Sequence, residues 1–148
     1  MVIVDEIDYR NAKAVLEAVA QNELAEIYSI LSSHENNINL EPSNDKQRQL
    51  SKQVQHWFVD NGWESEIPSR AVPDMRYDLV KNKVAVEIEL GHQRLVFPDF
   101  FEFMADYSKQ YINAGVMIVT GDPHLFGYSW HCSIESTRRK LQSIQDVF

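Results

Sequence analysis

Three acidic side chains in the middle of the sequence have the type and spacing of a metal-binding group. Asp78 lies in one strand-like segment, and Glu87 and Glu89 lie two residues apart in the next. Between residues 83 and 90 aliphatic side chains alternate with the two glutamates, so one face of the predicted strand is aliphatic and the other carries both carboxylates. Carboxylate oxygens, without histidine or cysteine, are the ligands that suit Mg²⁺. The pattern therefore predicts a magnesium site, although E-x-E taken alone is more often a solvated sheet face.

The register between the two predicted strands decides whether Asp78 can join the glutamates. We take Lys81-Asn82 as a tight two-residue turn, which places Asp78 opposite Ala85. Asp78 then shares a face with both glutamates and lies diagonal to Glu87, about 7–8 Å away between backbone positions. A slip of one residue would move Asp78 to the aliphatic face. Carboxylates gathered in this way repel one another and raise their pKa values unless a cation joins them.

Hydrophobic periodicity predicts a single α/β domain over residues 1–148. The expected elements are helices at 10–31, 46–60, 97–111 and 134–148 and strands at 63–67, 76–80, 83–90 and 115–119. The helix at 97–111 is expected to bury Phe97, Phe101, Met104 and Tyr111. With the strands before and after it, this helix makes a βαβ unit whose crossover should be right-handed.

The overall charge argues against a polyanionic partner such as DNA, but its distribution weakens that argument. The formal net charge is −8 at pH 7. Residues 1–45 hold nine acids and two bases, a net of −7, whereas residues 46–148 hold thirteen acids and twelve bases, a net of −1. Three of those thirteen acids belong to the predicted metal site, where bound cations would offset them. The second part of the chain is therefore compatible with a phosphate backbone.

The remaining composition indicates a protein of a reducing compartment. Cys132 is the only cysteine, which excludes an intrachain disulfide and a multi-cysteine zinc site. No apolar run approaches the length of about 20 residues that a membrane helix needs. The acidic start of the sequence lacks the basic region of a signal peptide. We expect a cytoplasmic location and no membrane segment.

The segment from Asp78 to Glu89 resembles the PD-(D/E)xK nuclease superfamily, and within it the BglII/BamHI group of restriction endonucleases. That group carries an aspartate at the end of one strand and E-x-E or E-x-Q on the next, here Asp78, eight intervening residues and Glu87-Ile88-Glu89. The resemblance extends through the predicted helix to residues 114–120 and weakly back to residues 61–64. It implies a restriction-endonuclease-like core, in which a mixed sheet is accompanied by N-terminal helices and a βαβ crossover.

The same resemblance implies a role for each residue of the group. Asp78, Glu87 and the backbone carbonyl of Ile88 would ligate Mg²⁺, for which Mn²⁺ can substitute. Glu89 would orient or deprotonate the attacking water, at the position where most of the superfamily has lysine. An upstream acid or amide often completes such a site, and Glu64 is our candidate.

Some other residues are open to more than one interpretation. Asp74, in the pair Pro73-Asp74, is an alternative to Asp78 but lies farther from the E-x-E. Two groups could approach phosphates or could be ordinary solvated surfaces: His92, Gln93 and Arg94 after the E-x-E, and Arg138, Arg139 and Lys140 in the last helix.

The function that the resemblance implies is a type II restriction-like endonuclease that hydrolyses phosphodiester bonds in double-stranded DNA. A homodimer is expected, because two symmetric active sites are the simplest way to cut both strands. One alternative is a non-catalytic nuclease-fold module that binds DNA or a protein partner. Another is a glycosidase, which also uses paired carboxylates, but aromatic residues do not flank Glu87 and Glu89 as a sugar site would require.

Overall fold

The computed structural model describes residues 1–126 and 131–147 of the chain. Its helices are α1 (Ala12–Val19), α2 (Gln21–Ser32), α3 (Lys46–Asp60), α4 (Val96–Ser108) and α5 (Ile134–Ile144), and its strands are β1 (Glu64–Pro68), β2 (Arg76–Lys81), β3 (Val84–Ile88) and β4 (Ala114–Ile118). Two short 3₁₀ turns, at Gln93–Leu95 and Pro123–Phe126, precede α4 and follow β4. The end of the helix expected at 134–148 includes Phe148, which lies outside the described residues.

The four strands form one mixed sheet in the order β1-β2-β3-β4. β2 is antiparallel to both of its neighbours, β1 and β3. β3 and β4 are parallel. The βαβ unit expected from the sequence is therefore present, with α4 as the crossover helix between β3 and β4. All five residues of β3 are buried, as expected of a central strand with helices on both of its faces.

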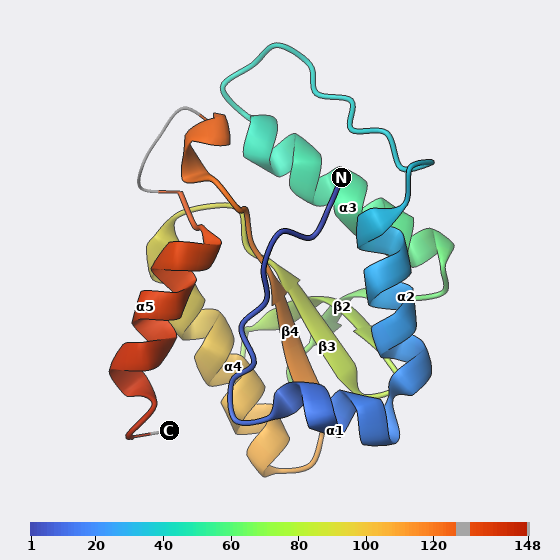
Figure 1. The fold of residues 1–148 in the computed structure, drawn as a ribbon. Helices are drawn as coiled ribbons and strands as arrows, with labels where there is room; N and C mark the ends of the chain where they lie inside the picture. Colours follow the sequence, from blue (N-terminus) through green and yellow to red (C-terminus); the bar gives the residue numbers. More distant parts are fainter. Residues whose placement is uncertain (127–130, 148) are drawn as a thin grey trace.

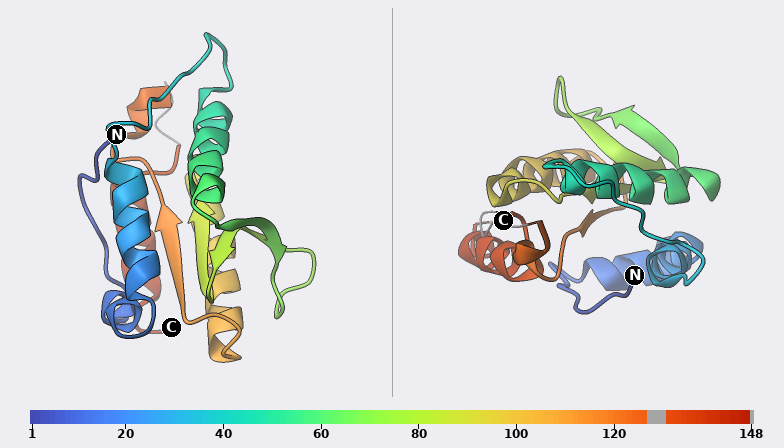
Figure 2. Two further views of the ribbon diagram at one scale, coloured as in Figure 1. Left: turned by 90° about the vertical axis from the view of Figure 1, so that its right-hand side faces the viewer. Right: turned by 90° about the horizontal axis from the view of Figure 1, so that it is seen from above.

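Different helices cover the two faces of the sheet (Figures 1 and 2). Helices α1 and α2 lie on one side of β3 and β4, and α4 lies on the other side. The aliphatic face of β3, including Val84, Val86 and Ile88, joins residues of α1, α2 and α3 in the larger hydrophobic core. The opposite face packs Ala85 against Phe103 of α4 in a smaller core. The side of β3 that carries the acidic residues is thus the side that faces α4.

The N-terminal helical region differs from the sequence prediction in one respect. The continuous helix expected at 10–31 is two helices, because the backbone of Ala20 leaves the helical region at φ −146° and ψ 42°. Leu16, Ala20 and Ile27 nevertheless all face the same core. Hydrophobic periodicity reports which side of a segment is buried, and it does not report whether the helix axis bends between two buried residues.

The turn between β2 and β3 corrects the predicted register. Lys81 pairs with Val84, so the two turn residues are Asn82 and Lys83 and not Lys81-Asn82. Both have positive φ, 47° and 63°, which is the backbone of the type I′ turn favoured in two-residue hairpins. The pairing is therefore displaced by two residues from the prediction: Ala85 pairs with Val80 and not with Asp78. The same register, extended by one pair beyond Leu79 and Val86, puts Asp78 across from Glu87. A displacement of two leaves every side chain on its predicted face.

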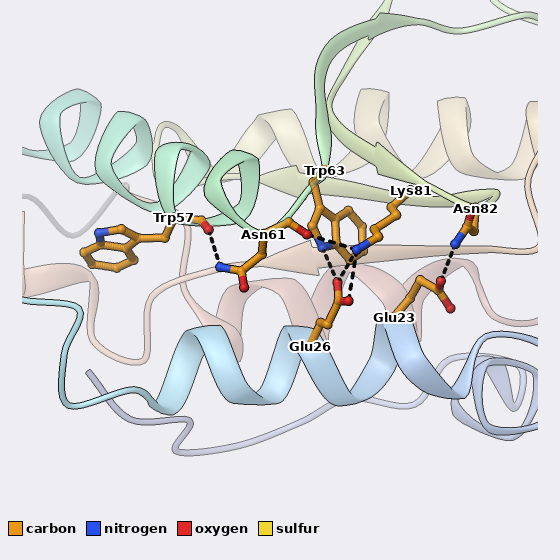
Figure 3. A network of polar contacts seen from close by, with 7 residues as sticks. All are labelled: Glu23, Glu26, Trp57, Asn61, Trp63, Lys81 and Asn82. Atoms are coloured by element: carbon orange, nitrogen blue, oxygen red, sulfur yellow. Dashed lines mark hydrogen bonds and ion pairs between the residues drawn. The ribbon is translucent and has the colours of Figure 1, made fainter.

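A polar network holds this hairpin turn against the N-terminal helices (Figure 3). Lys81 donates hydrogen bonds to both carboxylate oxygens of Glu26 in α2, at 2.8 and 2.9 Å, and to the carbonyl oxygen of Asn61. The indole N–H of Trp63 donates to the same glutamate, and Asn82 donates to Glu23 one turn earlier in α2. The network fixes the end of the β2-β3 ladder and, through it, the register that places Asp78 across from the E-x-E strand.

None of the helices in the described ranges, 1–126 and 131–147, has an apolar stretch of the length needed to cross a membrane.

Candidate active site

The β2-β3 hairpin brings Asp78 and Glu87 together as the centre of an acidic site. Because they are opposed across an antiparallel pair, their Cβ atoms are expected about 4.5–5.5 Å apart. The carboxyl of Glu87 donates a hydrogen bond to that of Asp78. Asp78 Oδ2 also accepts the backbone N–H of Ile88 at 2.7 Å. Glu87 is only 7% exposed and Asp78 is half-buried, so this pair does not lie on a solvated sheet face.

Glu89 lies one residue beyond the end of β3 and forms a second acid pair with Asp99. Its Oε1 accepts the backbone N–H of Gly91 at 2.8 Å, and its carboxylate accepts a hydrogen bond from the carboxyl of Asp99 in the first turn of α4. A side-chain carbon at Gly91 would lie 3.0 Å from Glu89 Oε1, so glycine allows this close approach. The sequence alone did not indicate Asp99 as a site residue.

Helix α4 turns an acidic face toward the sheet, which corrects the expected orientation of this helix. Phe97 and Phe101 were expected to be buried, but they are 41% and 57% exposed. The buried residues of α4 include Glu102 and Asp106, which follow Asp99 at helical spacings of three and seven. Hydrophobicity alone misplaced the face, because the side chains that line the sheet here are carboxylates. The acids at positions i, i+3 and i+7 were the available signal.

Asp106 has a structural role that separates it from the other two acids. Its carboxylate accepts hydrogen bonds from the Ser69 hydroxyl at 2.9 Å, the Ala71 backbone N–H at 2.6 Å and the Tyr77 hydroxyl at 2.8 Å. Every one of these donors belongs to β2 or to the connection before it. Asp106 thereby ties α4 to the strand that carries Asp78.

The acids of the site have raised pKa values, because they are buried close to one another. The pKa of Glu87 is raised to about 10, first by burial and then by the charges of Asp78, Asp99 and Glu102. The pKa of Asp99 is raised to about 8 by burial and by Glu89, and that of Glu102 to about 7 by burial and by neighbouring acids. Burial is also the largest cause of the raised pKa values of Asp78 and Glu89.

The donor set fits a hard divalent cation. The side chains are all carboxylates, and two buried oxygens, Asp99 Oδ2 and Glu102 Oε1, have no hydrogen-bond partner within the described part of the chain. Buried polar atoms without partners are rare, and a bound ion is one way in which a protein satisfies them. Across residues 1–126 and 131–147, no three His, Cys, Asp or Glu side chains already converge on one point. The acids instead form two hydrogen-bonded pairs, which a cation would have to open.

The other predicted residues are distributed unevenly around this site. Glu64 is exposed on β1, opposite Val80. The upstream acid whose charge raises the pKa of Asp78 is Glu66, two residues later, which also accepts a hydrogen bond from Gln55 at 3.0 Å. Asp74 is exposed in the connection between β1 and β2. For Ile88, whose carbonyl was predicted as a ligand, the contact made with the acid pair is through its N–H.

These features together define a class of protein: a mixed α/β sheet with N-terminal helices and a βαβ crossover, as in restriction endonucleases, with carboxylates gathered at the central hairpin. Residues 4–147 match the family described as restriction endonuclease BglII/BglIII, and the chain belongs to this family of DNA endonucleases.

A solved structure supports the same fold. The chain is similar to restriction endonuclease BglII in its crystal structure complexed with a DNA 16-mer, with a TM-score of 0.63 at 15% sequence identity. The similarity covers 96% of this chain and 69% of the other. No curated protein sequence matches the chain. The restriction-endonuclease-like fold expected from the sequence is confirmed, and the glycosidase alternative is left without support.

Proposed function

We infer that the protein cleaves double-stranded DNA in a reaction that depends on Mg²⁺, at the site formed by Asp78, Glu87 and Glu89. The observation that carries this proposal is the pairing of half-buried Asp78 with buried Glu87 on the α4 side of the sheet, with Glu89 two residues after Glu87. A pure binding module would gain nothing from burying acids where phosphates must approach, because the like charges repel.

The residues of this site are proposed to have different roles, in binding the metal and in accepting a proton. Asp78 and Glu87 would hold the cation, with the Ile88 carbonyl as a further ligand. Bound there, Mg²⁺ would lower the pKa of a water molecule and offset charge on the phosphate. Glu89 is held by the Gly91 N–H, and its free lone pairs can accept a proton from the attacking water. For the fourth position we now favour Glu66 over Glu64, because Glu66 interacts electrostatically with Asp78.

Basic groups next to the E-x-E provide a place for the DNA backbone. The pKa of His92 is lowered, first by desolvation and then by the positive charges of Arg94, Lys140 and His131. These charges therefore lie near one another, although Lys140 is in α5 and Arg94 is in the turn before α4. Clustered Lys and Arg side chains are what positions a phosphate backbone. This favours the phosphate-binding interpretation for Arg94 and Lys140 over ordinary solvated surfaces.

The protein is proposed to act as a homodimer. Phe101 is 57% exposed on α4, the helix whose buried residues include acids of the site. Phe97 is 41% exposed, but its ring already lies under Lys140 of α5, 5.2 Å from Nζ. A second copy packed on Phe101 would bury its ring and relate two active sites by a two-fold axis, as required for cutting two antiparallel strands.

Plasmid cleavage tests the function directly. Purified protein is incubated with supercoiled plasmid in Mg²⁺, Mn²⁺ or EDTA, and the ends of the products are sequenced. We expect cleavage with either metal and none in EDTA, with linear product appearing early because a dimer cuts both strands in one encounter. Asp78→Asn should be inactive, and Asp74→Asn, at an exposed position away from the site, should retain activity. Plasmid that stays intact under all metal and salt conditions would contradict the catalytic proposal and favour the non-catalytic module.

A further inference from the structure

Two buried carboxylate oxygens on α4 lack a hydrogen-bond donor among the described residues. Glu102 is 1% exposed, and its Oε1 has no partner within residues 1–126 and 131–147. The same holds for the buried Oδ2 of Asp99. The two residues are three apart on one helix, so their side chains lie side by side, with about 5–6 Å between Cβ atoms. Leaving even one buried acceptor unpaired costs about 1–3 kcal/mol, and more for a charged group.

The electrostatic surroundings of this pair are acidic. The groups that act on the charge of Asp99 are Glu89, Asp78 and Glu102, and those that act on Glu102 are Asp106 and Asp78. Every one of them is a carboxylate. Once ionised, these groups accept hydrogen bonds and donate none, so they cannot satisfy the unpaired oxygens. A divalent cation can satisfy both oxygens at once.

We propose that Asp99 and Glu102 of helix α4, together with Glu89, form a second divalent-cation subsite beside the one assigned to Asp78 and Glu87. This inference rests on the proposed metal-dependent function and extends it by residues that come from the crossover helix and not from the hairpin. Oxygen donors only, on rigid secondary structure, suit Mg²⁺ or Mn²⁺. Asp99 and Glu89 are already hydrogen-bonded to each other. The three side chains do not yet converge on one point within residues 1–126 and 131–147, so the ion would draw them together.

The packing of α4 on the sheet fixes the acidic face at this position. Phe103, next to Glu102, fills the space that a side chain at Gly115 of β4 would need, since a Cβ there would lie 2.3 Å from its ring. Asp106, one turn further on, is bound to Tyr77 at 2.8 Å. The helix is therefore held close to the sheet on both sides of Glu102.

Counting bound metal tests the subsite without reference to activity. Mn²⁺ bound at equilibrium to the full chain is measured by dialysis and by electron paramagnetic resonance of the free ion. We expect two equivalents for the unmodified protein and one for Asp99→Asn. Loss of an outer-shell partner already lowers metal affinity by about 10–100-fold, so loss of a ligand should weaken the second equivalent at least tenfold. Glu102→Gln, which is nearly isosteric, should have the same effect.

Two further variants distinguish the possible outcomes. Glu17→Gln, at an exposed position on α1, should keep both equivalents and controls for loss of surface charge. Glu87→Gln should lose the other equivalent while Asp99 and Glu102 retain theirs. A single equivalent that Asp99→Asn and Glu102→Gln leave unchanged would overturn the second subsite and leave the proposed function intact. No bound Mn²⁺ at millimolar concentration would contradict both. Circular dichroism checks that each variant is folded.

Discussion

Glu87 is 7% exposed and lies on β3, whose other residues are all buried. Its carboxyl group is near three other acids, Asp78, Asp99 and Glu102. An acid in such a place is maintained at the expense of stability, because burial and like charges both disfavour its ionised form. A folding role alone would be served better by an aliphatic or amide side chain. Site residues of this kind are identified by the misfit between their chemistry and their surroundings.

Replacing Glu87 therefore should stabilise the metal-free protein. The folded-state pKa of about 10 lies above the ordinary value of 4.5, so the folded protein retains a proton that the unfolded chain releases. The stability contributed by this group is present below pH 4.5 and is lost as pH rises toward 10. In EDTA at pH 8 we expect Glu87→Gln to be more stable by on the order of 1–3 kcal/mol.

Urea unfolding with and without Mn²⁺ checks this prediction. The advantage of Glu87→Gln should shrink at pH 5, and Mn²⁺ should stabilise the unmodified protein but not the variant at the first subsite. Glu64→Gln, exposed on β1, is the matched control and should change little at either pH. A Glu87→Gln protein that is less stable in EDTA at pH 8 would mean that the carboxyl group has a structural role.

At the scale of the elements, the sequence predicted the hairpin better than the helix. Period-two alternation placed Asp78, Glu87 and Glu89 on one face. The predicted turn residues were wrong, but the register was in error by two residues, which leaves each side chain on the same face. The turn itself was misjudged because its conformation depends on positive φ at Asn82 and Lys83, and only the first is a residue type that commonly adopts it.

Helix α4 shows why the rest of the site could not be predicted. Its most hydrophobic residues, Phe97 and Phe101, are exposed, and acids take the buried face. A hydrophobic stripe identifies the inward face only where the neighbouring surface is apolar. Here the neighbouring surface carries Glu87, so Asp99 and Glu102 were missed. Which residues meet across β3 and α4 depends on tertiary packing, which periodicity within one segment does not contain.

The close packing of α4 on β4 gives a prediction at the same scale. Gly115→Ala should destabilise the protein by about 1–3 kcal/mol, because the new methyl group would overlap the Phe103 ring and displace the helix. Displacement of α4 should also weaken the second Mn²⁺ equivalent while leaving the first, which belongs to the hairpin. Gly62→Ala is not a suitable control, because Gly62 has a φ of 83°. If Gly115→Ala binds metal as the unmodified protein does, the second subsite does not depend on the position of α4.

At the scale of the whole molecule, the charge distribution has to be reconciled with a DNA substrate. The net charge is −8, and the excess of acids lies in residues 1–45. The two N-terminal helices cover the face of the sheet opposite the acidic site (Figure 2). The acids of these helices, Glu17, Glu23 and Glu26, are thus separated from the site by the sheet. Arg94 and Lys140 lie near His92, three residues after Glu89. Binding to DNA should therefore depend on a small number of basic contacts.

The dependence of DNA affinity on salt measures those contacts. Each phosphate contact that is lost should reduce the slope of log K against log salt by about 1, because one counterion fewer is released. We expect Arg94→Ala and Lys140→Ala each to have this effect for a short duplex in EDTA, and the double variant to lose about 2 units of slope. Arg139→Ala, an exposed base on the same helix as Lys140, should leave the slope unchanged. Fluorescence anisotropy over a range of salt concentrations gives the four slopes. Equal slopes for the Arg94, Lys140 and Arg139 variants would show that the DNA backbone binds elsewhere on the molecule, and the site would then have to be approached from a side other than α5.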